Sequence, residues 1–368
     1  MKSKILYILT KPDLGGVSKY LLEIVTHIQK NVEPYFIMSS PGYFSEQLEK
    51  LGYKNNTFFI PMTNSIINLP LHIMSNLQTL NIIRRIKPDL IHCNSTTGGI
   101  VGRICGALTF TPVIFTAHGW AFTDGISQNK QIFYKFLEVA LSSITKKIIC
   151  VSEYDKQLAL NVSSLLKNKL ITIHNGITDI EGCYQKHKFS ENTLKIVMIS
   201  RFCPQKDPYT LINAVQELNL EGLNISLDLY GYGEELDNVL QFIHKKNCKN
   251  IQYKGKIDNV APILKRYDIY SLISNWEGLP IGIIEALRAG LPVIASDVGG
   301  CSELIIDNGY LIPRKDKKEL KDKIKILYQN HKLLTRFSRN SRSIYEKFFN
   351  AKNMINATFK VYGVNQNV

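Results

Sequence analysis

Short apolar stretches recur along the first half of the chain, and most are followed by a segment with helical periodicity. Such stretches predict buried strands, and the segments between them predict amphipathic helices. The predicted strands lie at residues 4–9, 34–39, 56–60, 89–92, 112–117, 147–151 and 170–173, and the predicted helices include residues 17–29, 71–86, 131–144 and 154–166. This alternation predicts a doubly wound parallel sheet, which places its ligand at the carboxyl ends of the strands.

A similar alternation returns after residues 181–192, a segment without apolar periodicity that we interpret as a linker. A strand at residues 194–199 is predicted to open a second sheet, and helices are predicted at residues 211–220, 316–329 and 332–349. The sequence therefore predicts an α/β protein with two domains, at residues 1–180 and residues 193–350.

The stretch from Asn275 to Gly300 carries the clearest local pattern. The apolar run at residues 268–274 is typical of a buried parallel strand. Pro280 suits the first turn of a helix, where its missing N–H is not needed. The apolar spacing of residues 283–287 is helical, and residues 292–296 are predicted to form the next strand.

Two carboxylates lie eight residues apart in this stretch, Glu277 in the loop and Glu285 about one turn into the helix. The helix start at residues 279–283 offers free amides, which favour a phosphate. Candidate substrate-binding residues from this turn are Leu279, Pro280 and Ile281. The carboxylates then flank the phosphate and accept hydrogen bonds from hydroxyls. A ligand with hydroxyls on both sides of a phosphate is a nucleotide-sugar.

The residues around these carboxylates resemble the Glu-x7-Glu motif of the family 4 glycosyltransferases. The resemblance includes Glu-Gly-Leu-Pro at residues 277–280, Ala-Gly-Leu-Pro-Val-Ile-Ala at residues 289–295 and Asp-Val-Gly-Gly at residues 297–300. This family has the GT-B fold, in which two Rossmann-like doubly wound domains face each other across a cleft. Its last helix returns to the first domain, and about residues 351–368 resemble that helix. The alternative is a capped helix with a surface glutamate.

Gly15 and Gly16 follow the first predicted strand and come immediately before a predicted helix. Paired glycines let the backbone approach a ligand closely, although a plain turn has the same composition. In the family that the chain resembles, a Gly-Gly loop at this place lies against the phosphate and sugar of the donor. The resemblance makes both glycines candidate substrate-binding residues.

His118 ends the fifth predicted strand and is followed by glycine. A lone histidine is more often packed than functional, but a strand end in such a sheet opens toward the ligand site. The family carries a His-Gly at this place, near the donor sugar, so the resemblance implies a catalytic role for His118. Trp120 and Phe122 either stack on sugar rings or close the loop over the core. His92 ends another predicted strand. We interpret it as a structural residue in preference to a site residue.

Arg201 and Lys206 leave the first strand of the second sheet together. A cation about 4 Å from one phosphate charge contributes about 4 kcal/mol at an effective dielectric near 20, before desolvation. Two cations in a surface loop also occur without any binding function. The family, however, has an Arg-x4-Lys at this position, bound to the donor diphosphate. The resemblance therefore implies that Arg201 and Lys206 hold the leaving diphosphate.

The segment at residues 228–236 contains Gly231 and Gly233, but Leu236 occupies the position of a third glycine. A dinucleotide-binding Gly-x-Gly-x-x-Gly fingerprint is therefore not expected. In the family this loop borders the nucleotide, which makes Gly231 and Gly233 candidate substrate-binding residues.

The resemblance covers nearly the whole chain and implies transfer of a sugar from a nucleotide-sugar, such as a UDP- or GDP-sugar, to an acceptor hydroxyl. Family members retain the anomeric configuration and need no metal, so neither a metal site nor a cofactor is expected. Glu277 is placed on the hydroxyls of the donor sugar, and Glu285 is placed on the ribose. The implied catalytic residues are Glu277, His118, Arg201 and Lys206.

The net charge is +14, and residues 311–352 hold 13 basic and 4 acidic residues. This charge suits an anionic partner, namely a nucleotide diphosphate, an anionic lipid or a nucleic acid, or else forms a solvated helix face without a partner. No nucleic-acid recognition motif is present, so a nucleic-acid partner is not expected.

Residues 120–125 look like those of bacterial transferases that assemble polysaccharides such as capsule and O-antigen. The acceptors of those enzymes are polyprenyl-diphosphate-linked sugars, so a glycan on a lipid carrier is the expected acceptor. The charge-free residues 58–83 and the basic Arg84, Arg85 and Lys87 fit an anionic membrane surface, or else a buried helix with a solvated end.

The seven cysteines form no Cys-x-x-Cys pair, and no signal peptide or membrane-spanning apolar run is found. We therefore expect a cytoplasmic protein with reduced thiols. If the basic helix end meets a membrane, the expected location is the inner face of the cell membrane.

Two functions of other classes fit the same residues. A nucleotide-sugar epimerase of the same fold binds the donor but uses no acceptor, and a non-catalytic nucleotide-sugar binding protein has no turnover. Nucleotide release with and without an acceptor separates these functions from sugar transfer.

Overall fold

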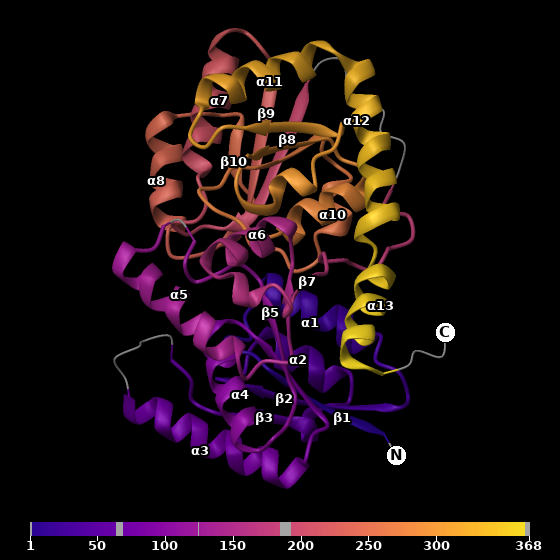
Figure 1. The fold of residues 1–368 in the computed structure, drawn as a ribbon. Helices are drawn as coiled ribbons and strands as arrows, with labels where there is room; N and C mark the ends of the chain where they lie inside the picture. Colours follow the sequence, from indigo (N-terminus) through magenta and orange to yellow (C-terminus); the bar gives the residue numbers. More distant parts are fainter. Residues whose placement is uncertain (1, 64–68, 124, 185–192, 365–368) are drawn as a thin grey trace. The chain divides into compact units, whose positions relative to one another are not determined.

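The computed structural model describes residues 2–63, 69–123, 125–184 and 193–364. Contacts within the chain divide it into two compact units (Figure 1). The first unit comprises Met1–Gly176 with Ala351–Val368, and the second comprises Ile177–Asn350. Each unit is built on its own parallel sheet, so the predicted α/β class with two Rossmann-like sheets is confirmed.

The sheet of the first unit has seven parallel strands in the order β3-β2-β1-β4-β5-β6-β7. The chain order reverses beside β1, which pairs with β2 on one side and β4 on the other. Doubly wound sheets bind ligands outside the carboxyl ends of the strands at this reversal. The strands are β1 (Ser3–Ile8), β2 (Val32–Met38), β3 (Thr57–Phe59), β4 (Leu90–Asn94), β5 (Val113–Ala117), β6 (Lys147–Cys150) and β7 (Leu170–Thr172).

Helices connect these strands and cover the sheet (Figure 1). Helix α1 contacts α2 and α13, whereas α4 contacts α3 and α5. The helices are α1 (Gly16–Thr26), α2 (Tyr43–Lys50), α3 (Leu69–Ile86), α4 (Thr96–Leu108), α5 (Gln128–Ser142), α6 (Glu153–Val162) and α13 (Ala351–Tyr362), with 3-10 turns η1 (Lys54–Asn56) and η2 (Ser164–Leu166).

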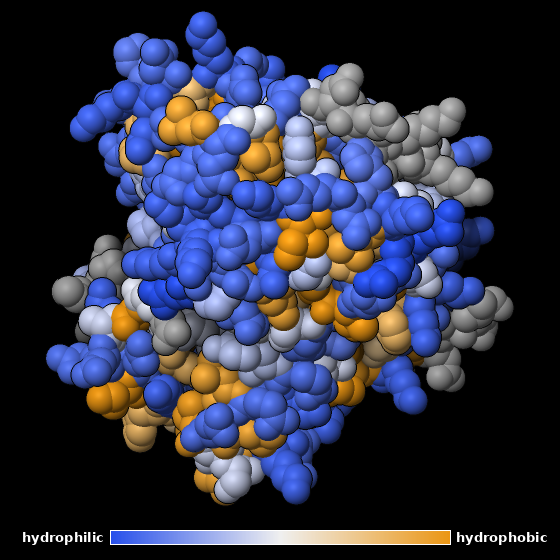
Figure 2. Space-filling model, turned by 90° about the horizontal axis from the view of Figure 1, so that it is seen from above, coloured by the Kyte–Doolittle hydropathy of each residue, from blue (hydrophilic) through white to orange (hydrophobic). Residues whose placement is uncertain are grey.

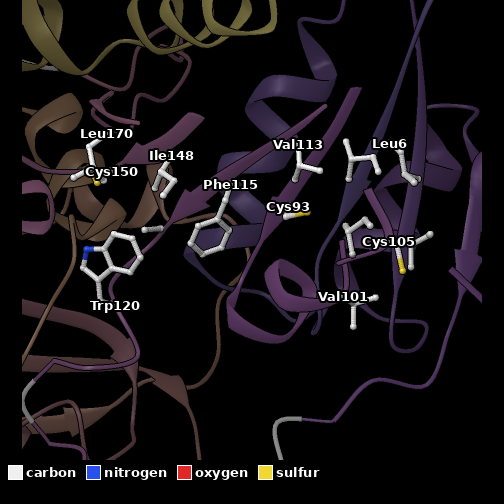
Figure 3. Close-up of a cluster of buried hydrophobic side chains, with 14 of the residues drawn as sticks. Leu6, Cys93, Val101, Cys105, Val113, Phe115, Trp120, Ile148, Cys150 and Leu170 are labelled. Carbon is white, nitrogen blue, oxygen red and sulfur yellow. The ribbon is translucent and has the colours of Figure 1, made fainter. Parts of the chain in front are cut away.

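A core of the first unit lies between the strands and the helices α3, α4 and α6 (Figure 3). Strands β4 and β5 are buried at every residue, as expected for central strands of a parallel sheet. Trp120 and Phe122 belong to this core. Full burial of one such large apolar side chain contributes about 1.5–3 kcal/mol.

The sheet of the second unit has six parallel strands in the order β10-β9-β8-β11-β12-β13. The strands are β8 (Leu194–Arg201), β9 (Ile225–Tyr232), β10 (Ile251–Tyr253), β11 (Ile269–Leu272), β12 (Val293–Ser296) and β13 (Gly309–Ile312). The helices are α7 (Pro208–Leu220), α8 (Leu236–Lys246), α9 (Ala261–Leu264), α10 (Ile281–Ala289), α11 (Lys317–Gln329) and α12 (His331–Ile344), with the 3-10 turn η3 (Gly299–Glu303) and the π-helical turn η4 (Tyr345–Phe349). The predicted strand–loop–helix–strand is present as β11, α10 and β12.

Residues 177–180, which the sequence analysis placed in the first domain, make their contacts in the second unit. Ile177 pairs with Asn350, and its carbonyl accepts a hydrogen bond from Tyr345 at 3.0 Å. The guanidinium of Arg288 donates to the carbonyl of Thr178 at 2.8 Å. Most of the predicted linker, residues 185–192, lies outside the described residues.

The C-terminal helix α13 belongs to the first unit. The hydroxyl of Tyr362 lies 2.6 Å from Nδ1 of the fully buried His92 on β4. The other ring nitrogen of His92 lies 2.7 Å from the hydroxyl of Thr116 on β5. His92 therefore joins two strands and α13, as the architectural interpretation predicts.

The basic segment at residues 311–352 is partly engaged with carboxylates of the second unit. Lys321 pairs with both Glu217 and Glu221, and Lys317 and Lys325 add further pairs to the same acids. Figure 2 shows the molecule from the end at which α11 lies in Figure 1, and hydrophilic residues cover much of this view, with hydrophobic patches among them. Part of this charge therefore forms a surface network, so the charge of the segment does not by itself indicate an anionic partner.

None of the helices that the structure describes combines the length and the hydropathy needed to cross a membrane.

Candidate active site

In the second unit, the loop after β8 is fixed against the loop after β11. The amide of Asn275 donates to the carbonyl of Gln205 at 2.7 Å, and the amide of Asp207 donates to the carbonyl of Ile273 at 2.9 Å. Because both loops leave the carboxyl edge of the sheet, this pairing places Lys206 beside the segment that contains Glu277.

The carboxylate of Glu277 is held at both oxygens. The ammonium of Lys206 pairs with Oε1, and the side-chain amide of Gln205 donates to Oε2 at 3.1 Å. The same amide also donates to the carbonyl of Trp276 at 2.8 Å. The side chain of Glu277 is only 6% exposed. A carboxylate that is nearly buried needs such partners, because an unpaired charge there is costly.

Helix α10 begins at Ile281, with Pro280 as the residue that precedes it. The prediction of free amides throughout residues 279–283 is wrong at Ile283, whose amide donates to the carbonyl of Pro280 at 3.1 Å. Pro280 itself has no N–H to donate. The first-turn amides available for an anion are therefore those of Ile281 and Gly282.

Tyr270 on β11 packs against the start of α10. Its hydroxyl donates to the carbonyl of Ile199 at 3.1 Å and occupies the space that a side chain at Gly282 would need. Burial raises the pKa of Tyr270 well above its usual value, and the charges of Glu285 and Glu277 raise it further. Glu285 lies on α10, about one turn after Ile281.

Arg201 is the last residue of β8, and its side chain is exposed. It makes no ion pair with any residue that the structure describes, in contrast to Lys206. A pocket of about 290 Å³ adjoins Lys206 and is lined also by Asp207, Tyr209, Asn275 and Lys315. The carboxyl edge of the second sheet thus carries cationic side chains next to a pocket.

Gly231 and Gly233 have a packing role that the sequence analysis did not give them. Their φ angles are +142° and +145°, which L side chains rarely adopt. A side chain at Gly231 would overlap the carbonyl of Ser200, and one at Gly233 would overlap that of Phe202. This close approach fixes the loop after β9 against the end of β8. Contact of these glycines with a substrate stays a prediction.

In the first unit, Gly15 precedes α1 with extended backbone, at φ −167° and ψ −179°. Any residue can adopt this conformation, and no atom of the described residues lies within 4 Å of the place that a Cβ would take. Neither backbone strain nor packing against the described residues accounts for glycine at this position. Gly16 is the first residue of α1, so its amide belongs to the free first turn.

His118 follows β5 and is half-buried. Its Nε2 lies 2.9 Å from the side-chain oxygen of Asn94, which ends β4. The edge of its ring meets Tyr20 of α1, with centroids 4.7 Å apart. Burial lowers the pKa of His118 to about 3, so the ring is neutral near neutral pH.

The two aromatic residues after His118 serve the core. Trp120 lies in the core beside Phe115 (Figure 3). It stacks on Phe122 with centroids 5.1 Å apart, and its indole N–H donates to the carbonyl of Asp155 at 2.7 Å. Both rings are nearly fully buried, so of the two alternatives the closing of the loop over the core is the one observed. Asp124 lies outside the described residues.

Several side chains that shape these two groups of residues, one in each unit, were missed from sequence. Gln205 and Asn94 contact Glu277 and His118, and Tyr270 supports α10. The position of Gln205 next to Lys206 is a signal that could have been used. Nothing in the local sequence marks Asn94 or Tyr270, because their partners are distant along the chain. The described residues contain no cluster of three or more His, Cys, Asp or Glu placed to bind a metal ion.

Two Rossmann-like units with cations and a carboxylate at the edge of the second sheet define the class of GT-B glycosyltransferases. Residues 14–179 match the model of Glycosyltransferase Family 4, and residues 179–344 match the model of Glycosyl transferases group 1. The two matches together cover most of the chain, so the protein belongs to the family 4, group 1 type glycosyltransferases.

Two curated relatives come from Escherichia coli. The O-antigen biosynthesis glycosyltransferase WbnH is 28% identical over 83% of this chain and 85% of its own length. The UDP-Gal:alpha-D-GlcNAc-diphosphoundecaprenol alpha-1,3-galactosyltransferase is 28% identical over 98% of this chain and 96% of its own length.

Solved structures share the fold. Anabaena Alr3699/HepE in complex with UDP-glucose aligns with a TM-score of 0.83 at 19% identity, covering 98% of this chain and 99% of that chain. The structure of TarM aligns with a TM-score of 0.78 at 15% identity, with the same coverage.

Proposed function

We propose that the protein transfers a sugar from a nucleoside-diphosphate sugar to a hydroxyl of a lipid-linked glycan, with retention of the anomeric configuration and without a metal ion. The observation that carries the proposal is the group formed by Lys206, Glu277 and the start of α10 at one edge of the second sheet. Cations and free helix amides suit a diphosphate, and a nearby carboxylate suits sugar hydroxyls.

The leaving diphosphate is assigned to Arg201, Lys206 and the first amides of α10. Negative charge develops on the leaving oxygen in the transition state, and fixed donors at that place stabilise it. Arg201 supplies an exposed guanidinium, and Lys206 supplies an ammonium beside the pocket. These donors supply positive charge for the leaving diphosphate, which is why we propose metal-independent transfer.

Glu277 is assigned to the hydroxyls of the donor sugar, and Glu285 to the ribose. Gln205 and Lys206 hold the carboxylate of Glu277 in one orientation. A carboxylate fixed in this way both orients the sugar and favours positive charge at the reacting carbon. We propose that the acceptor hydroxyl attacks on the face from which the diphosphate leaves, which gives retention without a covalent enzyme intermediate.

The first unit is proposed to contact the donor sugar through Gly15, Gly16 and His118. The open space beside Gly15 supports this assignment, because packing within the described residues gives no reason for glycine there. His118 presents a neutral ring at the carboxyl edge of its sheet.

The acceptor and the donor base are proposed by analogy with the relatives. The name of one relative gives UDP-Gal as donor and a diphosphoundecaprenol-linked sugar as acceptor, and another relative is named for O-antigen biosynthesis. We therefore propose a UDP-sugar as the first donor to test and a polyprenyl-diphosphate-linked glycan of a surface polysaccharide as the acceptor.

A membrane surface is proposed as a further partner, because two helices of the first unit expose apolar stripes. The stripe on α3 includes Ile73 and Leu77, which are 53% and 57% exposed, and the stripe on α5 includes Ile132 and Phe136, which are 65% and 75% exposed. Helices normally bury such a stripe. The predicted residues 58–83 overlap α3, with residues 64–68 outside the described residues.

The charge around these stripes favours anionic lipid. Helices α3, α4 and α5 carry one acidic residue, Glu138, which is buried and pairs with Arg103 at 2.6 Å. Arg84, Arg85 and Lys130 are exposed on α3 and α5. Each basic residue near an anionic surface contributes about 1 kcal/mol of attraction. This surface suits a protein whose acceptor is anchored in a membrane, and we propose peripheral association with the inner face.

The function is tested by incubating the full-length protein with UDP-galactose, UDP-glucose, UDP-N-acetylglucosamine or GDP-mannose and a synthetic undecaprenyl-diphosphate-linked N-acetylglucosamine. We expect one donor to yield a larger lipid-linked glycan, with an α-linkage by NMR and an unchanged rate in EDTA. An inverted linkage would contradict retention, and loss of the rate in EDTA would contradict metal independence. Nucleotide-sugar interconversion without acceptor would instead favour an epimerase, and binding without turnover a non-catalytic protein.

A further inference from the structure

At the carboxyl edge of the first sheet, His118 and Asn94 form a hydrogen bond whose donor and acceptor can be assigned. Nε2 of His118 lies 2.9 Å from Oδ1 of Asn94, and the amide nitrogen of Asn94 donates to the carbonyl of His92 at 3.5 Å. Reversing the Asn94 side chain would place its oxygen against that carbonyl oxygen, with no hydrogen to share. The oxygen of Asn94 therefore faces His118.

This direction decides which nitrogen of His118 carries the hydrogen. A carboxamide oxygen only accepts hydrogen bonds, so Nε2 must donate. In a neutral imidazole the other nitrogen then has a lone pair and only accepts. Nδ1 of His118 has no hydrogen-bond partner among the residues that the structure describes, and the ring is half-buried rather than enclosed.

We propose that Asn94 is a positioning residue that holds His118 as the Nε2–H tautomer and so presents Nδ1 as an acceptor to the donor substrate. This inference rests on the proposed function, because it deepens the role given there to His118. An accepting nitrogen takes a hydroxyl of the sugar and repels a phosphate oxygen, which has no hydrogen to give. His118 thus distinguishes the hexose end of the donor from its diphosphate.

Burial keeps the ring neutral, and the neighbouring groups add no charge beside it. Tyr20 of α1 and His92 of β4 are the titratable groups that face it, and neither is charged near neutral pH, since burial raises the pKa of Tyr20 to about 12 and lowers that of His92 to about 3. Asn94 is neutral as well. A carboxylate in place of Asn94 would favour the imidazolium, in which Nδ1 carries a hydrogen and no longer accepts.

The test is NMR of the full-length protein labelled with ¹⁵N-histidine, because protonated and unprotonated ring nitrogens differ strongly in ¹⁵N shift. We expect Nε2 of His118 to be the protonated nitrogen in the wild type between pH 6 and 8. In Asn94→Asp we expect the ring to titrate within or near this range. A wild-type ring protonated at Nδ1, or an unchanged titration in Asn94→Asp, would overturn the proposal.

A kinetic comparison separates positioning from simple structural support. With the donor and acceptor that show turnover, transfer by Asn94→Asp is expected to fall about tenfold per pH unit below its new pKa and to recover at higher pH. The matched control is Asn161→Asp on the exposed side of α6, whose profile should follow the wild type. Absence of turnover with every donor would contradict the proposed function, while the NMR result would still decide the tautomer.

Discussion

At the residue scale, the main feature is that Glu277 and Lys206 contact each other, although the sequence analysis gave them separate ligand groups. Gln205 completes this arrangement by donating to the second carboxylate oxygen. A sugar hydroxyl that binds Glu277 therefore meets a carboxylate whose orientation is already set. Such preorganisation lowers the cost of reaching the transition state.

The contribution of Gln205 is tested by Gln205→Met, which keeps the side-chain length and removes the donor. A hydrogen bond to a charged group contributes about 1.5–3 kcal/mol, so we expect transfer to slow by roughly 10- to 100-fold. The measurement is kcat/KM for the donor, with Gln241→Met on the exposed side of α8 as the matched control. Equal rates in the two variants would show that Gln205 does not position Glu277.

Two histidines with lowered pKa values, His92 and His118, give the protein a defined pH dependence of stability. Burial lowers the pKa of His92 to about 3, below the value of about 6.5 for an unfolded histidine. Between these values the unfolded chain binds a proton that the folded chain does not, so the free energy of unfolding falls as pH falls from 6.5 toward 3. His92 alone contributes up to about 1.4 kcal/mol per pH unit.

This dependence is measured by chemical denaturation at several pH values. We expect a shallower loss of stability in His118→Gln than in the wild type, because His118 shares the lowered pKa. His244→Gln on the exposed face of α8 is the control and should keep the wild-type slope. Parallel curves for all three proteins would contradict a lowered pKa of His118 in the folded protein.

At the element scale, the sequence predicts strands well where they are short, apolar and bounded by polar residues. It does not predict α4, whose sequence contains four glycines in thirteen residues. Glycine is a poor helix former, but here Gly102 and Gly106 lie so close to Cys93 and Val113 that side chains would overlap them. Close packing of α4 on the sheet overrides its low propensity, and only the tertiary structure reveals this.

The exposed stripes on α3 and α5 are tested by flotation with vesicles. We expect the protein to float with phosphatidylglycerol-containing vesicles at low salt and less with phosphatidylcholine alone. Replacing Phe133 and Phe136 by serine removes exposed apolar surface from α5 and should reduce binding several-fold. The control replaces Leu165 and Leu220, exposed leucines outside α3 and α5. Equal binding by both double variants, or no binding by the wild type, would contradict the membrane proposal.

At the scale of the whole molecule, the order of motifs along the chain predicts the two sheets, because each motif follows a strand end. Contacts between distant residues could not be predicted in the same way. Lys206 and Glu277 are 71 residues apart, and Tyr362 and His92 are 270 residues apart. These pairs arise because parallel strands bring loops to one edge and because α13 returns to the first unit. The sequence motifs identify the candidate residues, but only the folded structure shows which residues they contact.

The central claim is that Glu277 acts on the donor sugar at the edge of the second sheet. Glu277→Gln tests it most directly, because the amide keeps the size of the side chain, whereas alanine would leave Lys206 without its partner. We measure transfer to the lipid-linked acceptor, together with the rise in melting temperature caused by the donor. The account predicts a loss of transfer on the order of 10²- to 10³-fold with donor binding retained. Transfer near the wild-type rate would contradict it.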